Sequence, residues 1–184
     1  MDVKASASEI GSAHHRFLQL VSIESTGSIT ELKREVQRLR QELAMTDNEL
    51  ELLNIDALAV FWNSDLGKQI RASRHELHRE LEFTARFSIQ ALASLTGEPL
   101  ASSLPQEFVV IQGVADLVVL KPSEIWLVDF KTDSIKPDTL AARAKFYEPQ
   151  MKLYATALAQ IYRRPVAACW VYFLECSTAI AISV

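Results

Sequence analysis

The chain has 184 residues, of which 49% are hydrophobic and 23% are charged, and its formal net charge is −4. These values fit one globular domain, residues 1–184, whose core is large enough to need no disulfide staple. They exclude a uniformly basic nucleic-acid-binding protein, so contact with a polyanion requires a local patch or a neighbouring domain that delivers the strand.

The cysteines and the apolar stretches bear on cellular location. The two cysteines, Cys169 and Cys176, are too few for a four-cysteine zinc or iron–sulfur site and favour reduced core residues. Met1-Asp2-Val3-Lys4 lacks the charged-then-apolar order of a signal peptide, and no stretch approaches the length of a membrane span. We therefore expect a cytoplasmic protein without membrane contact.

Residues 1–73 are predicted to form a helical N-terminal part, because their apolar side chains recur at three- and four-residue spacing. The predicted helices run from Ser8 to about Gly27, over residues 29–43, from Thr46 through Phe61, and from Leu66 to Ala72. Thr46 to Glu49 has the form of a capping box, and Asn63-Ser64-Asp65 is typical of a helix start. The apolar seam of residues 29–43 is too short for a coiled coil.

Residues 74–184 are predicted to form a catalytic core that combines a sheet with one long helix, so the expected fold class is α/β (α+β). The predicted strands are His75–Ile89, Val109–Leu120, Ile125–Phe130, Val166–Leu174 and Thr178–Val184, with a helix from about Thr139 to Arg163 and loops over Ser94–Gln106 and Ser134–Asp138.

Two of these strands carry charged residues at their ends. Lys121-Pro122-Ser123-Glu124 has turn chemistry, which predicts an antiparallel hairpin. Side chains alternate across a strand, so Asp129 and Lys131 share a face that Asp116 on the neighbouring strand can reach. Carboxylate oxygens of this kind suit a hard divalent ion such as Mg²⁺.

The alternative for such an Asp-x-Lys pair is an ion pair on a solvated strand face. Its context argues against this, because Asp129 follows the uninterrupted apolar run Ile125-Trp126-Leu127-Val128, which is typical of a buried central strand. A charge at the end of such a strand is costly to bury unless it is paired or binds a metal.

Motifs along nearly the whole chain resemble those of one nuclease family. In chain order they are Gly11-Ser12-Ala13-His14-His15, Phe61-Trp62-x-Ser64-x-Leu66-Gly67, Arg79-Glu80-Leu81-x-Phe83, Gly113-x-x-Asp116, Asp129-Phe130-Lys131-Thr132-Asp133 and Tyr147-x-x-Gln150-x-x-x-Tyr154. Together they resemble the PD-(D/E)XK nucleases, and specifically the carboxy-terminal nuclease domain of the helicase–nuclease subunits RecB and AddA, with Ser12 where that family has Thr. The resemblance implies a restriction-endonuclease-like core, a central mixed sheet flanked by helices.

The resemblance also implies roles for single residues. His15, Asp116 and Asp129 would bind the metal together with the backbone carbonyl of Phe130. Asp116, Asp129 and Lys131 would be catalytic. The implied ion is Mg²⁺, with Mn²⁺ as the alternative, and the number of ions stays open.

Other residues are less firmly placed by the same motifs. Gln150 and Tyr154, one helical turn apart, would position the DNA strand. A shift of one residue in the first helix would put His14 in the place of His15. Glu80 could join the acidic cluster, but a solvated strand carboxylate is the favoured interpretation.

The implied activity is metal-dependent hydrolysis of DNA phosphodiester bonds, as the carboxy-terminal exonuclease module of an ATP-dependent helicase–nuclease in double-strand break repair and recombination. The expected partners are single-stranded DNA, a helicase motor domain and a second helicase–nuclease subunit. The chain has no Gly-x-x-x-x-Gly-Lys-[Ser/Thr] motif, hence no ATP site, and lacks the four cysteines of an iron–sulfur cluster. A nuclease-like interaction module without activity of its own and a stand-alone endonuclease remain as alternatives.

Overall fold

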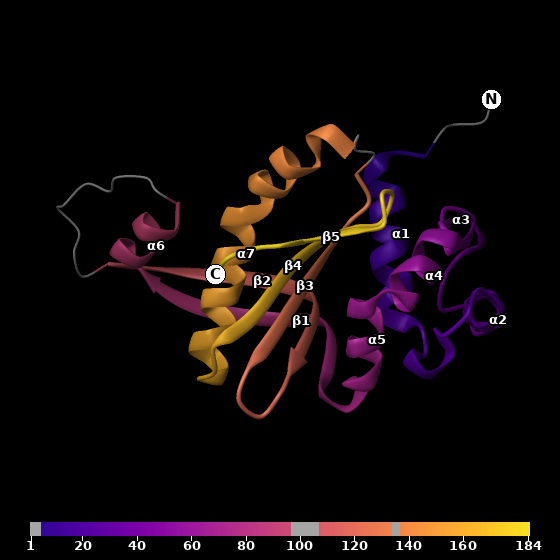
Figure 1. Cartoon of the computed structure of the whole chain (residues 1–184), viewed down its shortest axis with the longest axis horizontal. Coiled ribbons are helices and arrows are strands. Elements are labelled where there is room, and N and C mark those ends of the chain that lie inside the picture. Colours follow the sequence, from indigo (N-terminus) through magenta and orange to yellow (C-terminus); the bar gives the residue numbers. More distant parts are fainter. Residues whose placement is uncertain (1–4, 97–106, 134–136) are drawn as a thin grey trace.

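The structure, a computed structural model, describes residues 5–96, 107–133 and 137–184 (Figure 1). Its N-terminal part is helical, as predicted. The helices of this part are α1 (Ala7–Leu20), α2 (Ile29–Gln41), α3 (Asp47–Glu51), α4 (Ile55–Asn63) and α5 (Asp65–Ala72), with short 3-10 helices at Ile23–Ser25 and Arg74–Glu76. The predicted capping box is confirmed, because the Thr46 hydroxyl accepts from the Glu49 backbone N–H while the Glu49 carboxylate accepts from that of Thr46.

Two predicted helix bounds in this part were wrong. The first helix ends at Leu20, not near Gly27, because Val21 turns to an extended conformation. The predicted helix from Thr46 through Phe61 is two helices, α3 and α4. They are separated at Asn54, whose side chain accepts a hydrogen bond from the Ala57 backbone N–H and so begins α4.

The second part is a five-stranded mixed sheet in the order β1-β2-β3-β4-β5, which confirms the predicted α/β fold class. The remaining elements are β1 (Leu77–Ser88), α6 (Ile89–Thr96), β2 (Phe108–Leu120), β3 (Ile125–Lys131), a 3-10 helix (Pro137–Thr139), α7 (Leu140–Tyr162), β4 (Val166–Phe173) and β5 (Thr178–Ala181). Neighbouring strands are antiparallel except β3 and β4, which are parallel and are joined by α7 as the crossover.

Several boundaries differ from those predicted. Residues 94–96 belong to α6 rather than to a loop, and the last strand ends at Ala181. Pro137 and Asp138, predicted as loop, belong to a 3-10 helix. The other residues of the two predicted loops, 97–106 and 134–136, lie outside the described residues.

The sheet separates two apolar cores, one under each layer of helices (Figure 1). The N-terminal helices cover one face, where Phe17, Phe61 and Trp62 pack against strand residues such as Leu117 and Phe130. On the other face, Met151 and Leu158 of α7 pack against Phe83, Leu127 and other strand residues. Among the residues that the structure describes, no helix is both long enough and apolar enough to cross a membrane.

The sheet divides at one end, and this fork positions the site. β2 pairs with β3 only over Leu117–Leu120 and Ile125–Val128. The remainder of β2 pairs with β1 alone and forms a two-stranded ribbon, whereas the end of β3 pairs with β4 alone. Backbone groups and side chains at the point of divergence therefore face a gap rather than a neighbouring strand.

Candidate metal centre

Three carboxylates lie in one row across the fork. Glu80 on β1 lies opposite Asp116 on β2, because the β1–β2 ladder keeps one register on both sides of this position. Asp116 lies one step beyond the last β2–β3 pair, Leu117 with Val128, and therefore next to Asp129. Like charges on neighbouring strands repel each other, so this row favours a cation between its members.

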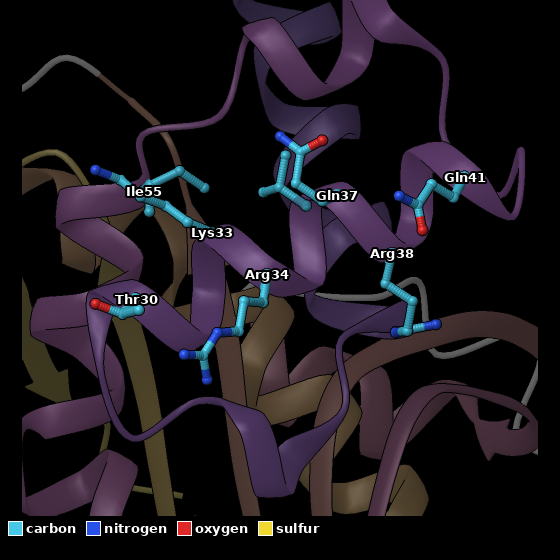
Figure 2. Close-up of a pocket in the computed structure, with 8 residues that line it drawn as sticks. Thr30, Lys33, Arg34, Gln37, Arg38, Gln41 and Ile55 are labelled. Carbon is cyan, nitrogen blue, oxygen red and sulfur yellow. The ribbon is translucent and has the colours of Figure 1, made fainter.

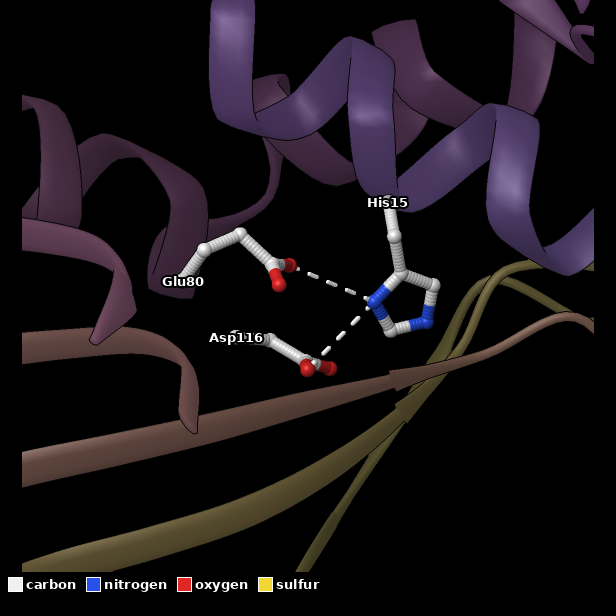
Figure 3. Close-up of side chains that lie close together, drawn as sticks. All are labelled: His15, Glu80 and Asp116. Atoms are coloured by element: carbon white, nitrogen blue, oxygen red, sulfur yellow. Dashed lines mark ion pairs between the residues drawn. The ribbon is translucent and has the colours of Figure 1, made fainter. Parts of the chain in front are cut away.

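Helix α1 brings His15 to this row (Figure 3). Its Nδ1 lies 3.3 Å from Oδ1 of Asp116 and 3.6 Å from Oε1 of Glu80. One ligand atom from each of these three residues lies within 4.8 Å of the other two. Burial would lower the pKa of His15, but the hydrogen bonds and charges of the two carboxylates overcome it and raise the pKa to about 10. A bound metal ion would need the neutral imidazole, so metal and proton compete for this ring.

The fork also exposes the backbone of Phe130 to the site. Its N–H donates to Oδ2 of Asp116 over 2.7 Å, and its carbonyl oxygen lies 3.1 Å from Nε2 of His15. The Phe130 ring is buried edge-on against Phe61, with the centroids 4.9 Å apart, which fixes the backbone in place. The carbonyl that the sequence motif implied as a ligand therefore lies at Nε2 of His15, whereas Asp116 and Glu80 lie at Nδ1 of the same ring.

His14, the alternative to His15, has a different environment. It is 2% exposed, its Nδ1 lies 2.8 Å from the Ile10 carbonyl, and its Nε2 accepts from the Asn54 backbone N–H over 2.9 Å. With Nε2 an acceptor, the ring is neutral and Nδ1–H donates to Ile10. His14 thus joins α1 to the start of α4, and both ring nitrogens are used within the fold.

We expect the His14 contacts to make stability depend on pH. Burial lowers the pKa of His14, although the Ile10 carbonyl and Glu175 act in the opposite direction. Below about pH 6.5 the unfolded chain then binds more protons at this position than the folded chain, so this contribution to stability falls as the pH drops through the folded pKa. His14→Gln should lower the free energy of unfolding by about 1–2 kcal/mol at neutral pH.

The difference between wild type and His14→Gln, measured by urea unfolding, should shrink between about pH 7 and pH 5, because glutamine does not titrate. His78→Gln is the matched control, because His78 is exposed. A difference that stays constant over this range would show that His14 is not held neutral by the fold.

Glu80 corrects a sequence-based interpretation. It was expected as a solvated strand carboxylate, but it is half-buried and faces His15 and Asp116. Its φ of 49° is in the left-handed region, which is unusual for a non-glycine residue. Before Glu80, Arg79 points toward the N-terminal helices, where it donates to the Leu18 and Val21 carbonyls; after it, Leu81 belongs to the core under α7. The strand changes its alternation at Glu80, and strain of this kind is often found at functional sites.

Asp129 and Lys131 form an ion pair, with Nζ 2.8 Å from Oδ2. Their side chains lie on one face of β3, as the two-residue period predicted. Burial and the Asp116 carboxylate raise the pKa of Asp129 above the ordinary range, although the Lys131 ammonium acts in the opposite direction. A buried carboxylate with this pKa is more basic than an exposed one and is stabilised in its charged form by any further cation.

A second group of side chains holds Lys131 from the side of α7. The ammonium lies 4.5 Å from the centroid of the Tyr147 ring. The Tyr147 hydroxyl donates to Oδ2 of Asp133 over 2.6 Å, and Arg143 donates to the same oxygen over 2.8 Å. Burial and the hydrogen bond to Asp133 raise the pKa of Tyr147 to about 12, so it is protonated at neutral pH. Asp133 and Arg143 thereby fix the ring over which the lysine lies.

Gln150 and Tyr154 lie on α7, one and two turns beyond Tyr147. The Tyr154 ring packs edge-on against Phe83, with the centroids 4.9 Å apart, on the face of the ribbon that α7 covers. The Gln150 side chain is half-buried, and within the described ranges no hydrogen bond ties it to the acidic cluster. Their implied role in positioning DNA stays a prediction.

The residues at the fork fit a divalent ion. Carboxylate and carbonyl oxygens are the preferred ligands of Mg²⁺ and Mn²⁺, and imidazole is acceptable to the latter. Oδ2 of Asp129 is fully buried, and no described residue donates an aligned hydrogen bond to it; only the Lys131 ion pair lies against it. The Lys131 ammonium offsets the cost of burying this oxygen, so the fit to a metal ion rests on the ligand types and on the convergence of His15, Glu80 and Asp116.

A hollow of about 520 Å³ on the outer side of α2 is a separate feature (Figure 2). It is lined mainly by long polar side chains, including Lys33, Arg34 and Gln37, and by no residue of the acidic cluster. Arg38 in this hollow is paired with Glu35 and Glu42 of its own helix. This hollow therefore lies apart from the acidic cluster.

Known proteins are similar in sequence to this chain over nearly its whole length. Residues 1–180 match the signature of the PD-(D/E)XK nuclease superfamily. Relatives named as the A subunit of an ATP-dependent helicase/nuclease are 30% identical over 178 residues in Listeria innocua, 31% over 169 in Moorella thermoacetica and 28% over 181 in Geobacillus kaustophilus. These matches cover 94%, 92% and 95% of this chain but only 14%, 12% and 14% of the relatives. The fold, the residues at the fork and this match agree, and the chain belongs to the PD-(D/E)XK nuclease superfamily.

Proposed function

We propose that this chain is a metal-dependent DNA nuclease domain that hydrolyses phosphodiester bonds as the exonuclease module of an ATP-dependent helicase–nuclease in double-strand break repair and recombination. The observation that supports this most directly is the convergence of His15, Glu80 and Asp116 at one fork of the sheet, where their ligand atoms lie within 4.8 Å of one another. Asp129 lies beside this group by strand register, one step beyond the last β2–β3 pair. The names of the relatives support a helicase partner, and we extend this to a cytoplasmic assembly with a motor domain and a second subunit.

The metal-binding role falls to the residues that face the gap. His15, Asp116, Asp129 and the Phe130 carbonyl would hold Mg²⁺ or Mn²⁺, with Glu80 as an additional carboxylate. The bound ion would neutralise charge on the phosphoryl oxygens and lower the pKa of a bound water.

Lys131 would supply a second positive charge beside the bound ion. An ammonium only donates hydrogen bonds, so it can hold the oxygen of the attacking water or stabilise the oxygens of the transition state. The ion pair with Asp129 and the contact with the Tyr147 ring restrict its position before substrate arrives. Gln150 and Tyr154 would act on the DNA strand from α7.

The test uses the 184-residue chain with a 5′-labelled single-stranded oligonucleotide. We expect cleavage in Mg²⁺ or Mn²⁺, none in EDTA, and no requirement for ATP, since the chain has no ATP site. A linear strand should be shortened from its end, while a circular single strand should survive.

Each alternative predicts a different result. Cleavage of the circle would indicate an endonuclease. Equal Mg²⁺ affinity of the wild type and Asp129→Ala in calorimetry, together with no cleavage of any substrate, would indicate an interaction module.

A further inference from the structure

Among the residues that the structure describes, nothing covers one face of the ribbon formed by β1 and β2, which is called the bare face below. On the other face, Phe83, Ala85 and Phe87 are buried in the core under α7. On the bare face the register places Glu82 opposite Val114, Thr84 opposite Gln112, and Arg86 opposite Val110. Val110 and Val114, on either side of Gln112 along β2, are 54% and 41% exposed, which is high for apolar residues on one strand face.

This bare face continues directly from the metal centre. From Glu82 and Val114 outward the alternation is regular, so the residues of this face point away from the side on which Phe83, Ala85 and Phe87 are buried. Glu80 and Asp116 stand at the near end of the ribbon. The N-terminal helices cover the sheet only up to this row, and the ribbon extends away from them toward α6 (Figure 1). A strand bound at the metal centre therefore has an open sheet surface beside it.

The far end of the face carries a cation and an aromatic ring in contact. The Arg86 guanidinium carbon lies 3.5 Å from the centroid of the Phe108 ring, and that ring is 50% exposed. Among the described residues Arg86 makes no ion pair, unlike Arg38 or Arg143 elsewhere in the fold. Between this pair and the metal centre, a hollow of about 330 Å³ is lined by Thr84, Gln112 and their neighbours on the two strands.

We propose that the bare ribbon face binds single-stranded DNA next to the cleavage site, with Phe108 as a stacking surface for a base and Arg86 as the phosphate contact. An exposed aromatic ring beside a guanidinium is the combination by which proteins bind unpaired strands. Arg86 lies six residues from Glu80, roughly 20 Å along the strand. That distance corresponds to about six nucleotides of a stacked strand and fewer of an extended one. The inference rests on the proposed function, because it takes the fork as the cleavage site.

Binding is measured by fluorescence anisotropy of a labelled oligothymidylate with Ca²⁺ in place of Mg²⁺, which limits cleavage. We expect Phe108→Leu, which keeps an apolar side chain but removes the ring, to weaken binding about fivefold or more. Arg86→Gln should weaken it and lower the slope of log affinity against log salt by about 0.7, the value for one phosphate of a single strand. Lys68→Gln, which removes an exposed cation on α5, is the matched control and should change neither.

A second measurement separates this inference from the proposed function. The rate on the oligonucleotide is compared with that on the p-nitrophenyl ester of thymidine 5′-monophosphate, which is too short to reach Arg86. In Phe108→Leu and in Arg86→Gln, the rate on the oligonucleotide divided by the rate on the ester should fall about fivefold or more. Folded variants with wild-type affinity and an unchanged ratio would overturn the ribbon assignment while leaving the nuclease intact.

A wild type that binds DNA but hydrolyses neither substrate would overturn the proposed function instead. A wild type that does not bind DNA but dimerises through Phe108 would identify the face as a protein contact and overturn the inference.

Discussion

Replacing Asp129 by Asn or Lys131 by Met is expected to lower the cleavage rate about a hundredfold or more. The first change removes the buried carboxylate whose Oδ2 lacks an aligned donor among the described residues, and the second removes the ammonium held against it. The rate is measured on labelled oligonucleotide with saturating Mg²⁺, and circular dichroism verifies the fold.

The hairpin contains its own control. Lys121 and Glu124 form a comparable ion pair, 3.3 Å apart, at the opposite end of the same two strands. Lys121→Met and Glu124→Gln should therefore leave the rate near that of wild type. If all four variants cleave at similar rates, the fork is not the catalytic site.

Gly67→Ala is expected to lower the free energy of unfolding by about 3 kcal/mol or more, which is at the upper end of the cost of overpacking. A Cβ at this position would overlap the Phe61 carbonyl oxygen and lie 2.8 Å from the Trp62 Cα. Both are backbone atoms, so no side chain can turn away to make room. The measurement is urea unfolding, with the midpoint and the slope compared to wild type.

Gln69→Ala is the control, because Gln69 is exposed on the same helix. A loss of less than about 1 kcal/mol in Gly67→Ala would mean that α4 and α5 separate at little cost. These contacts also explain the motif Phe61-Trp62-x-Ser64-x-Leu66-Gly67. Ser64 begins α5 by accepting a hydrogen bond from the Gly67 N–H, and the missing side chain of Gly67 lets α5 approach α4 closely.

The motif strands could be predicted because their signals are local. The turn residues between β2 and β3 fix the hairpin, and the two-residue period then puts Asp129 and Lys131 on one face. Their contact of 2.8 Å agrees with this. The order of motifs along the chain supplied the fold class in the same way, since each element contributes one short pattern.

The motif spacing favoured His15 over His14, but the physical difference between the two residues and the position of Glu80 depend on distant parts of the chain. His14 and His15 differ in what lies beyond α1: the Asn54 backbone on one side and the Phe130 carbonyl on the other. Glu80 was misjudged because its left-handed backbone interrupts the alternation of β1, so the strand looks weakly patterned in the sequence. Both outcomes depend on tertiary contacts that a window of neighbouring residues does not contain.

The contact between His15 and Phe130 joins residues 115 positions apart, and this has a consequence for folding during synthesis. The apolar side of α1, with Phe17 and Leu18, is buried against strand residues as well as against other helices. A nascent chain that has emerged only as far as α5 cannot yet bury this side on the sheet, because β2 and β3 follow later. Contacts this distant form slowly and leave apolar surface open to association in the meantime. The apolar side of α1 therefore stays exposed until β2 and β3 have been synthesised.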